Sequence, residues 1–246
     1  WFDLDDEGRI LSNTADEVIT ERTKIVAVTH VGNTTGAITD IAPMVKRAHE
    51  VGAVVVLDAC QSVPHLKIDL HALDVDFAAW SAHKMYGPTG VGFLYGKRDM
   101  LEALPPANFG GSMVELAWMD QEAQYMAPPA RFEAGTQPVA QVVAAGVAAE
   151  WLMNIGMENL EAHERVIAGE LLKMGQIDGV RILGPRTNEQ RIGTVAFEID
   201  GVHPHDVGQF IDAQGIAIRV GHHCAQPVHR HFGVYASNRA SSGIYN

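Results

Sequence analysis

The chain has 246 residues, of which 47% are hydrophobic and 20% charged, and its formal net charge at pH 7 is −12. This composition predicts a globular protein with a large core, and the negative charge argues against nucleic-acid binding, which needs clustered Lys and Arg. No apolar run reaches the roughly 18 residues of a membrane span. Two cysteines give no disulfide framework, which favours a cytoplasmic protein. The chain starts at Trp1 and ends in an apolar, strand-like run at 244–246, so both ends look cut from a longer protein.

The first half alternates apolar runs with one clear helix. Short continuous apolar runs, which are typical of strands buried on both faces, fall at 24–29 and 53–57. Two further strands are predicted over 77–80 and 91–95. A helix is predicted over 41–51, with Thr39 or Asp40 as its N-cap and Gly52 as its stop signal. The pattern predicts an α/β fold with a mainly parallel sheet.

The second half is predicted to be a smaller α+β unit. It follows a Pro-, Gly- and Met-rich stretch over 105–138, which we expect to cover the active site. Helices are predicted over 139–155, 158–174 and 205–213, and strands over 180–183, 194–199 and 216–219. We therefore divide the chain into a large domain, 1–138, and a C-terminal domain, 139–246.

Polar residues gather just after the predicted strand ends, where ligands of parallel sheets bind. They are His30, Asn33, Asp58, Gln61, Ser81, His83 and Lys84. A lysine and an aspartate at successive strand ends suit pyridoxal phosphate, which needs an amine for its Schiff base and a carboxylate beside its ring nitrogen. Asp58 and Lys84 are the candidates for these two roles. The run Gly87–Gly92 precedes a strand rather than a helix, so we interpret it as a turn passing close to the lysine.

A second group of reactive residues follows the strand at 216–219. Cys224 lies among His222, His223 and Arg219, whose positive charge would favour a nucleophilic thiolate. Two alternatives stay open here. A zinc site could use His223, Cys224 and His229, or Cys224 could be a structural buried thiol. Cys60 follows an apolar strand and is interpreted as a packing residue.

Five motifs together resemble the SUF-type (group II) cysteine desulfurases, which are fold-type I, pyridoxal-phosphate enzymes of the class V aminotransferase group. The motifs are His30-Val31-Gly32-Asn33, Asp58-x-x-Gln61, Ser81-x-His83-Lys84, Arg131 to Thr136, and Arg219 to Ala225. The resemblance covers essentially the whole chain, although family members are considerably longer. It implies a pyridoxal-phosphate-dependent transferase fold and conversion of L-cysteine to L-alanine.

The resemblance implies a role for each matching residue. Lys84 would bind the cofactor aldehyde, Asp58 would hold the ring nitrogen, Gln61 and Asn33 would lie near the ring oxygen, and Ser81 and His83 would contact the phosphate region. His83 is also the candidate for a second proton carrier. Thr136 would reach a phosphate in the opposite protomer of a homodimer. Arg239 would bind the substrate carboxylate, together with Asn33, and Cys224 would take the sulfur.

The resemblance also implies a partner protein, and one position of this sequence differs from the family pattern. The motif Gly201 to Asp206 is similar to that of desulfurases which pass sulfur to a small, zinc-containing scaffold protein for iron–sulfur cluster assembly, and His205 is the candidate zinc-binding contact. Ser242 stands where a larger aromatic residue is expected, which predicts looser packing beside Arg239. Competing functions are a selenocysteine lyase, an aminotransferase or an epimerase of the same fold, a zinc-binding module, or a non-catalytic fragment.

Overall fold

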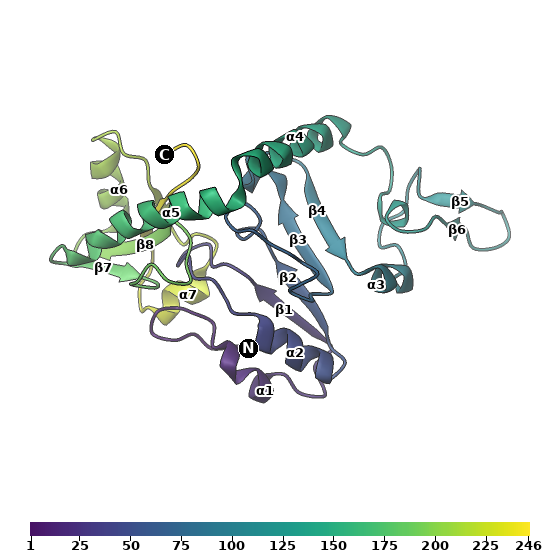
Figure 1. Cartoon of the computed structure of the whole chain (residues 1–246), viewed down its shortest axis with the longest axis horizontal. Coiled ribbons are helices and arrows are strands. Elements are labelled where there is room, and N and C mark those ends of the chain that lie inside the picture. The colour runs from purple at the N-terminus through teal and green to yellow at the C-terminus, as the bar shows by residue number, and fades with distance from the viewer.

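The computed structural model describes residues 1–246 and contains two four-stranded sheets (Figure 1). The first sheet has the order β1-β2-β3-β4, and each strand lies within one residue of its predicted range. Its strands are β1 (Ile25–Thr29), β2 (Val54–Asp58), β3 (Phe77–Ser81) and β4 (Gly92–Gly96). The pairs β1–β2 and β2–β3 are parallel, whereas β3–β4 is antiparallel. Parallel pairing needs a crossover of a dozen or more residues, and the connection over 82–91 is too short for one.

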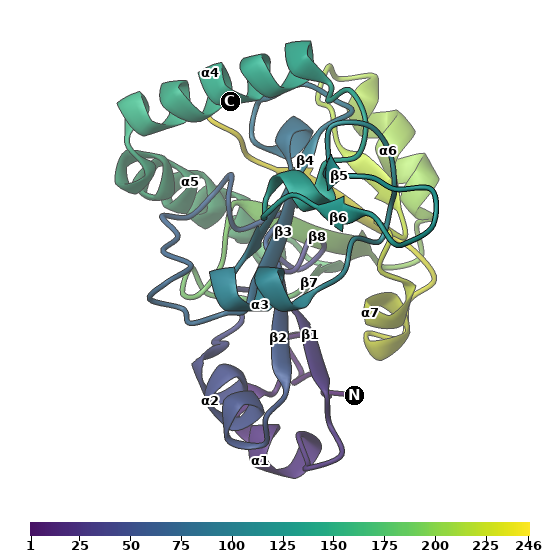
Figure 2. The same cartoon turned by 90° about the vertical axis from the view of Figure 1, so that its right-hand side faces the viewer.

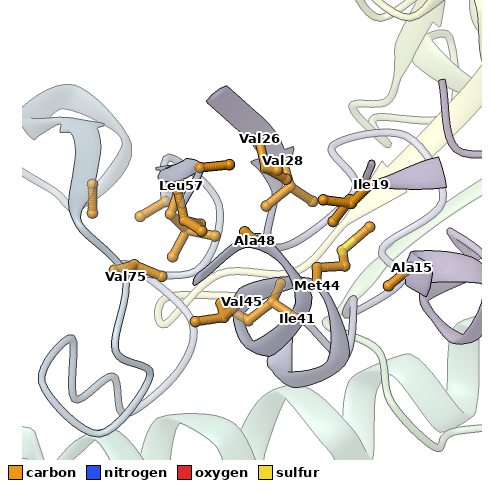
Figure 3. Close-up of a cluster of buried hydrophobic side chains, with 14 residues drawn as sticks. Ala15, Ile19, Val26, Val28, Ile41, Met44, Val45, Ala48, Leu57 and Val75 are labelled. Carbon is orange, nitrogen blue, oxygen red and sulfur yellow. The ribbon is translucent and has the colours of Figure 1, made fainter. Parts of the chain in front are cut away.

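The core of the first sheet lies between its strands and helix α2 (Ala42–Glu50) (Figure 3). Met44 and Ala48 on the helix and Val55 and Leu57 on β2 are completely buried. Each buried large aliphatic side chain contributes roughly 1.5–3 kcal/mol, so this contact holds the carboxyl ends of the strands in place.

The ends of α2 correct one prediction and confirm another. The N-cap position is Ile41 rather than Thr39 or Asp40. The Thr39 hydroxyl donates instead to the Thr29 carbonyl at 3.0 Å, while the Asp40 carboxylate accepts from the Ala42 N–H at 3.2 Å. Gly52 ends the helix as predicted, with a φ of +72° that favours glycine.

The second sheet has the order β7-β8-β10-β9 and is antiparallel throughout. Its strands are β7 (Val180–Leu183), β8 (Thr194–Ile199), β9 (Arg219–Gly221) and β10 (Ser237–Ser241). The predictions for β7 and β8 are confirmed, and β9 begins three residues later than predicted. The polar sequence of β10 gave no strand signal, and the apolar run at 244–246 is not a strand.

Two long helices connect the sheets, α4 (Val139–Ile155) and α5 (Met157–Leu172) (Figures 1 and 2). No single helix is long and apolar enough to span a membrane; the two together pass that test only as a pair bent by 76°. Helix α6 (Pro204–Asp212) is also confirmed. Short helices that the sequence did not reveal are α1 (Ala15–Val18), α3 (Arg98–Ala103) and α7 (Gln226–His231), with 3-10 turns at Ser12–Thr14, Ala82–Lys84, Ala130–Phe132 and Lys173–Gln176. The division at residue 138 stays a prediction.

The stretch over 105–138 contains a small hairpin, β5 (Val114–Leu116) and β6 (Gln124–Tyr125). It projects beyond α3, on the side of the first sheet away from the second sheet (Figure 1). The expectation that this stretch covers the active site stays a prediction, since within one chain the hairpin does not fold back over the second sheet. Nearly all of residues 103–127 are exposed, so the hairpin is held by few contacts with the rest of the chain.

Candidate active site

The carboxyl ends of β1, β2 and β3 lie side by side and place polar residues at one edge of the first sheet. Thr29 pairs with Asp58, and Asp58 pairs with Ala79. The His30 N–H donates to the Asp58 carbonyl at 3.1 Å, which continues the ladder beyond the last strand residue. Asp58 is exposed at this edge, so its carboxylate is available to a ligand.

Lys84 is placed by a tight turn directly after β3. The 3-10 turn Ala82–Lys84 begins at the strand end, and the Gly87 N–H returns to the Ala82 carbonyl at 3.0 Å. A Cβ atom on Gly87 would lie 3.0 Å from that same oxygen, so a larger residue would have to push the turn apart by a few tenths of an ångström. That the glycine run passes close to the lysine stays a prediction. Lys84 and His83 are both exposed, and neither side chain has a hydrogen-bond partner within the chain.

Cys60 belongs to this site, so its interpretation as a packing residue is wrong. Its N–H donates to the Asp58 carboxylate at 2.9 Å, and its Sγ lies 4.0 Å from the Ser81 hydroxyl. Burial raises the pKa of the Cys60 thiol, as do the hydrogen bond and the negative charge of Asp58, while the Lys84 ammonium partly opposes the rise. We call these four residues, Asp58, Cys60, Ser81 and Lys84, the strand-end site.

Cys60 lies beyond the end of β2, in the turn that follows Asp58, so the strand pattern gave no indication of its place in the site. Gln61 follows in the same turn and is half-buried. His30, at the end of β1, is buried; its Nδ1 has no partner, and burial lowers the pKa of its imidazole.

Asn33 links the first sheet to the second group of predicted residues. It lies at the tip of a closed loop, residues 30–38, which we call the Asn33 loop. Its side-chain amide donates to the His223 carbonyl at 2.5 Å, and its own carbonyl accepts from Arg239 Nη1 at 2.9 Å. One residue thus contacts both the segment that carries Cys224 and the predicted carboxylate-binding arginine.

Cys224 is presented to solvent by a turn of unusual backbone conformation. Residues 222–225, the Cys224 loop, follow β9, and the Ala225 N–H donates to the His222 carbonyl at 2.8 Å. His223 and Cys224 have φ angles of +50° and +58°, in the left-handed region that non-glycine residues seldom adopt. Cys224 itself is exposed, so the alternative of a structural buried thiol is wrong.

One buried hydroxyl holds the histidines behind Cys224. Ser237 Oγ lies 3.1 Å from His223 Nε2 and 2.9 Å from His229 Nε2. Because His229 Nδ1 lies 2.9 Å from the Ala225 carbonyl, this nitrogen carries the proton in a neutral ring, and its Nε2 accepts from Ser237. Ser237 then accepts from His223 Nε2. The sequence gave no indication of Ser237, because a serine on a short polar strand has no distinctive pattern.

This arrangement leaves the zinc alternative without support. No group of three His, Cys, Asp or Glu side chains is placed to hold a metal ion. His223 and His229 both direct Nε2 to Ser237 rather than to a common point beside Cys224.

Positive charge is concentrated around Cys224. Arg219 and Arg239 are cross-strand partners on β9 and β10. Burial lowers the pKa of Arg239, as does the charge of Arg219, and Cys224 opposes this. Burial lowers the pKa of His223 to about 4, with further contributions from Arg239 and His229, so the imidazole is neutral at pH 7. Arg239 Nε is buried without a hydrogen-bond partner, as expected of a guanidinium that binds the carboxylate of a ligand.

The remaining predicted residues lie outside the strand-end site and the Cys224 loop. Thr136 is exposed just after the 3-10 turn Ala130–Phe132, and no hydrogen bond joins it to the strand-end site. His205 is exposed on α6. The prediction of looser packing at Ser242 is wrong: this residue is buried, and its N–H and hydroxyl both donate to the Gly193 carbonyl, at 2.7 and 3.1 Å.

The side chains at this edge fit a small ligand that carries an aldehyde, a protonated ring nitrogen and anionic groups. Lys84 supplies an amine, Asp58 a carboxylate and Ser81 a hydroxyl, and the orphaned Arg239 Nε supplies a buried cationic donor nearby. Such a set can bind and orient a cofactor beside an amino-acid carboxylate.

Comparisons with known proteins identify the family of the chain. The family model described as aminotransferase class-V matches residues 1–246. A probable cysteine desulfurase of Mycobacterium leprae is 50% identical over 247 residues, and a cysteine desulfurase of Haloferax volcanii is 43% identical over 247; the alignments cover all of this chain and 58% of each relative.

Two solved structures that the chain resembles are also cysteine desulfurases. The crystal structure of a cysteine desulfurase from Escherichia coli matches with a TM-score of 0.92 and 36% identity over 99% of this chain and 60% of that chain. The apo structure of a cysteine desulfurase from Thermococcus onnurineus matches with a TM-score of 0.95 and 34% identity over 100% of this chain and 61% of that one. The chain thus spans about 60% of the length of these relatives, and it belongs to the aminotransferase class-V family.

Proposed function

We propose that the chain is the larger part of a pyridoxal-phosphate-dependent cysteine desulfurase, which converts L-cysteine to L-alanine and retains the sulfur as a persulfide on Cys224. The observation that carries this proposal is the position of Asn33. Its amide reaches the Cys224 loop and its carbonyl reaches Arg239, while its loop begins at the Asp58 ladder. These contacts support the proposal that the strand-end site and the exposed thiol of Cys224 belong to one active site.

The strand-end site would hold the cofactor. Lys84 would bind its aldehyde, Asp58 would keep its ring nitrogen protonated, Gln61 would lie near the ring oxygen, and Ser81 and His83 would contact the phosphate region. When bound, pyridoxal phosphate supplies an electron sink for the carbon that loses a proton. Lys84 would take that proton from the substrate α-carbon once its amine is free, with His83 as a second carrier. Cys60 would lie beside the ring as a neutral thiol.

Cys224 would accept the sulfur. Arg239 would bind the substrate carboxylate and fix the direction in which the substrate thiol points. The Cys224 thiolate would attack the substrate sulfur, so that a sulfur–sulfur bond forms as the bond between sulfur and the β-carbon breaks. The electron pair of the broken bond stays with the carbon fragment, which takes up protons and leaves as alanine. The sum is cysteine plus enzyme thiol giving alanine plus enzyme persulfide, with no external oxidant or reductant.

The cofactor assignment is tested in the full-length protein by borohydride reduction followed by peptide mapping. The pyridoxyl group should be found on Lys84 and on no other lysine. A label on Lys67 or Lys97, which are already engaged by carboxylates, would show that the strand-end site is not the cofactor site.

The sulfur assignment is tested by Cys224→Ala with Cys60→Ala as the matched control. Cys224→Ala should abolish alanine formation from cysteine and leave the absorbance of the bound cofactor unchanged, because the thiol acts after substrate capture. Cys60→Ala should still form a persulfide on Cys224. Normal turnover by Cys224→Ala would make the nucleophile role wrong and favour another enzyme of the same fold.

We further propose that the sulfur passes to a small zinc-containing scaffold protein of iron–sulfur cluster assembly, in the cytoplasm, and that His205 binds the partner's zinc. His203 and His205 stack with ring centroids 5.4 Å apart. The His205 N–H donates to His203 Nδ1 at 3.2 Å, which caps α6 and occupies His203. His205 has no side-chain hydrogen bond and is exposed, so its imidazole is the available metal ligand of the two.

The partner proposal predicts a specific loss. His205→Ala should keep basal turnover measured with a chemical reductant but lose stimulation by the zinc protein, whereas His71→Ala, at an exposed histidine of the first half, should keep both. Equal stimulation of His205→Ala and wild type would reject the zinc contact, and loss of basal turnover would assign His205 a structural role.

We also propose a homodimer in which the exposed hairpin extension brings Thr136 to the phosphate of the opposite protomer. This accounts for an extension that projects away from its own strand-end site. Thr136→Ala should weaken cofactor retention in the dimer, and a monomeric full-length protein in sedimentation would contradict the assignment.

A further inference from the structure

Arg191 is a buried arginine without an acidic partner. It lies between β7 and β8, its residue surface is 8% exposed, and its guanidinium hydrogen-bonds only to backbone carbonyls. Burial lowers the pKa of its guanidinium to about 10, so it remains charged at neutral pH. A buried charge is costly unless its hydrogen-bond donors are satisfied.

The guanidinium of Arg191 is satisfied by backbone carbonyls on both sides of the boundary between the two sheets. On the second-sheet side it donates to the carbonyls of Pro185 and Thr194. On the other side its Nη2 lies 3.4 Å from the Thr35 carbonyl, in the Asn33 loop. The planar fork of an arginine can bridge such separate acceptors, which a lysine ammonium cannot do in the same geometry.

The backbone around Arg191 forms a second connection to the same loop. Ala37 and Arg191 form an antiparallel bridge, the Ile192 N–H donates to the Gly36 carbonyl, and the Ile38 N–H donates to the Gln190 carbonyl, both at 2.9 Å. A Cβ on Gly36 would lie 2.4 Å from the Thr194 carbonyl, so the contact is as close as two backbones permit. One arm of the Asn33 loop is therefore attached to the second sheet.

Hydrogen bonds within the Asn33 loop connect its attached arm to its tip. The Gly36 N–H donates to the Gly32 carbonyl at 2.9 Å, and the Gly32 N–H donates to the Ala37 carbonyl at 2.8 Å, so the loop is closed on itself. Asn33 at the tip then binds the His223 carbonyl and Arg239. A shift of the Thr35–Ile38 arm would move Asn33 away from both.

We propose that Arg191 is a positioning residue: it holds the Asn33 loop against the second sheet, so that Asn33 keeps the Cys224 loop and Arg239 in register with the strand-end site. The inference rests on the proposed desulfurase function. It differs from simple stabilisation because it predicts that sulfur transfer to Cys224 slows in molecules that are folded and contain cofactor.

The test compares Arg191→Lys with Arg9→Lys in the full-length, cofactor-loaded protein. Arg9 is the matched control because its guanidinium donates to the neighbouring carbonyls of Gln190 and Glu189, at 2.9 and 2.8 Å, but not to the Asn33 loop. Persulfide formation on Cys224 is followed by mass spectrometry in a single turnover, and hydrogen exchange is measured for the peptide covering residues 33–38.

We expect Arg191→Lys to retain cofactor, to form the persulfide at least tenfold more slowly per loaded molecule, to raise KM for cysteine, and to exchange faster over 33–38. Arg9→Lys should match the wild type in cofactor retention, persulfide rate and KM. A lowered melting temperature with a normal persulfide rate would overturn the proposal and make Arg191 a purely structural residue.

Two further measurements test the proposal if the first variant does not fold or if the wild type forms no persulfide. If Arg191→Lys does not fold, Asn33→Ala still removes the amide donor to His223, and a normal persulfide rate in that variant would overturn the route through Asn33. If the wild type forms no persulfide on Cys224, the proposed function fails instead, and the hydrogen-exchange comparison still reports whether Arg191 holds the loop.

Discussion

Acidification should destabilise the second sheet through His223. The pKa of this buried imidazole is lowered to about 4, mainly by burial and then by the charge of Arg239. The unfolded chain binds the proton near the ordinary pKa of about 6.5, so it binds more protons than the folded chain between these values. The stabilising contribution is therefore complete above about pH 6.5 and is lost as the pH falls towards 4.

The magnitude follows from the two pKa values. The gap between about 6.5 and about 4 corresponds to about 3 kcal/mol of unfolding free energy, of which about 2 kcal/mol is lost between pH 7 and pH 5. His223→Gln removes the titrating group, so its unfolding free energy should fall by about 2 kcal/mol less than that of the wild type over this interval. The physical cause is that a protonated ring cannot be hydrated where Ser237 is its only partner.

The assay is urea unfolding of the full-length protein at pH 7, 6 and 5, with an NMR titration of the His223 ring as the direct readout. His71→Gln is the control: it keeps His223 and should therefore keep the full acid loss. Parallel pH dependence in the wild type and His223→Gln, or a His223 ring that titrates near pH 6.5, would refute the reasoning.

Two further predictions follow from the backbone contacts and the strand-end site. Gly36→Ala should lower the unfolding free energy by at least about 2 kcal/mol, because the new Cβ would lie 2.4 Å from the Thr194 carbonyl. Gly52→Ala is the control: its φ is similarly positive but nothing lies within 4 Å of the new Cβ, so it should cost only about 1 kcal/mol. Equal losses of unfolding free energy in urea would contradict this prediction. Alkylation of Cys60 should slow at least tenfold when pyridoxal phosphate is added to the apoprotein, and unchanged kinetics by peptide mapping would place the thiol outside the cofactor site.

Much of the fold was predictable because its signals are local. The strands β1 and β2 are nearly continuous apolar runs, β7 and β8 are largely apolar, and each is found within one residue of its predicted range. Strand β10 escaped prediction because Ser237, Asn238 and Arg239 are polar, and they are strand residues only because the neighbouring strands β8 and β9 bind their backbone.

The site was predictable where residue type and strand end coincide, as for Asp58 and Lys84. It was not predictable where tertiary contacts decide. Cys60 was given the wrong role because the turn after β2, which brings its N–H back to the Asp58 carboxylate, is visible only in the folded chain. Arg191 carried no signal at all, since only the folded chain shows that its partners are carbonyl oxygens of the Asn33 loop and of the second half of the chain.

The attachment of the Asn33 loop has a consequence for the order of folding. Thr35 and Arg191 are 156 positions apart along the chain, and Asn33 and His223 are 190 apart. Contacts of such long separation form late, because the entropy of closing the intervening chain must be overcome before they stabilise anything. During synthesis the first sheet can form while the second is still inside the ribosome. Asp58 and Lys84 are then in place early, but Asn33 reaches its position only after residue 223 has emerged, so the catalytic arrangement is completed in the last stage of folding.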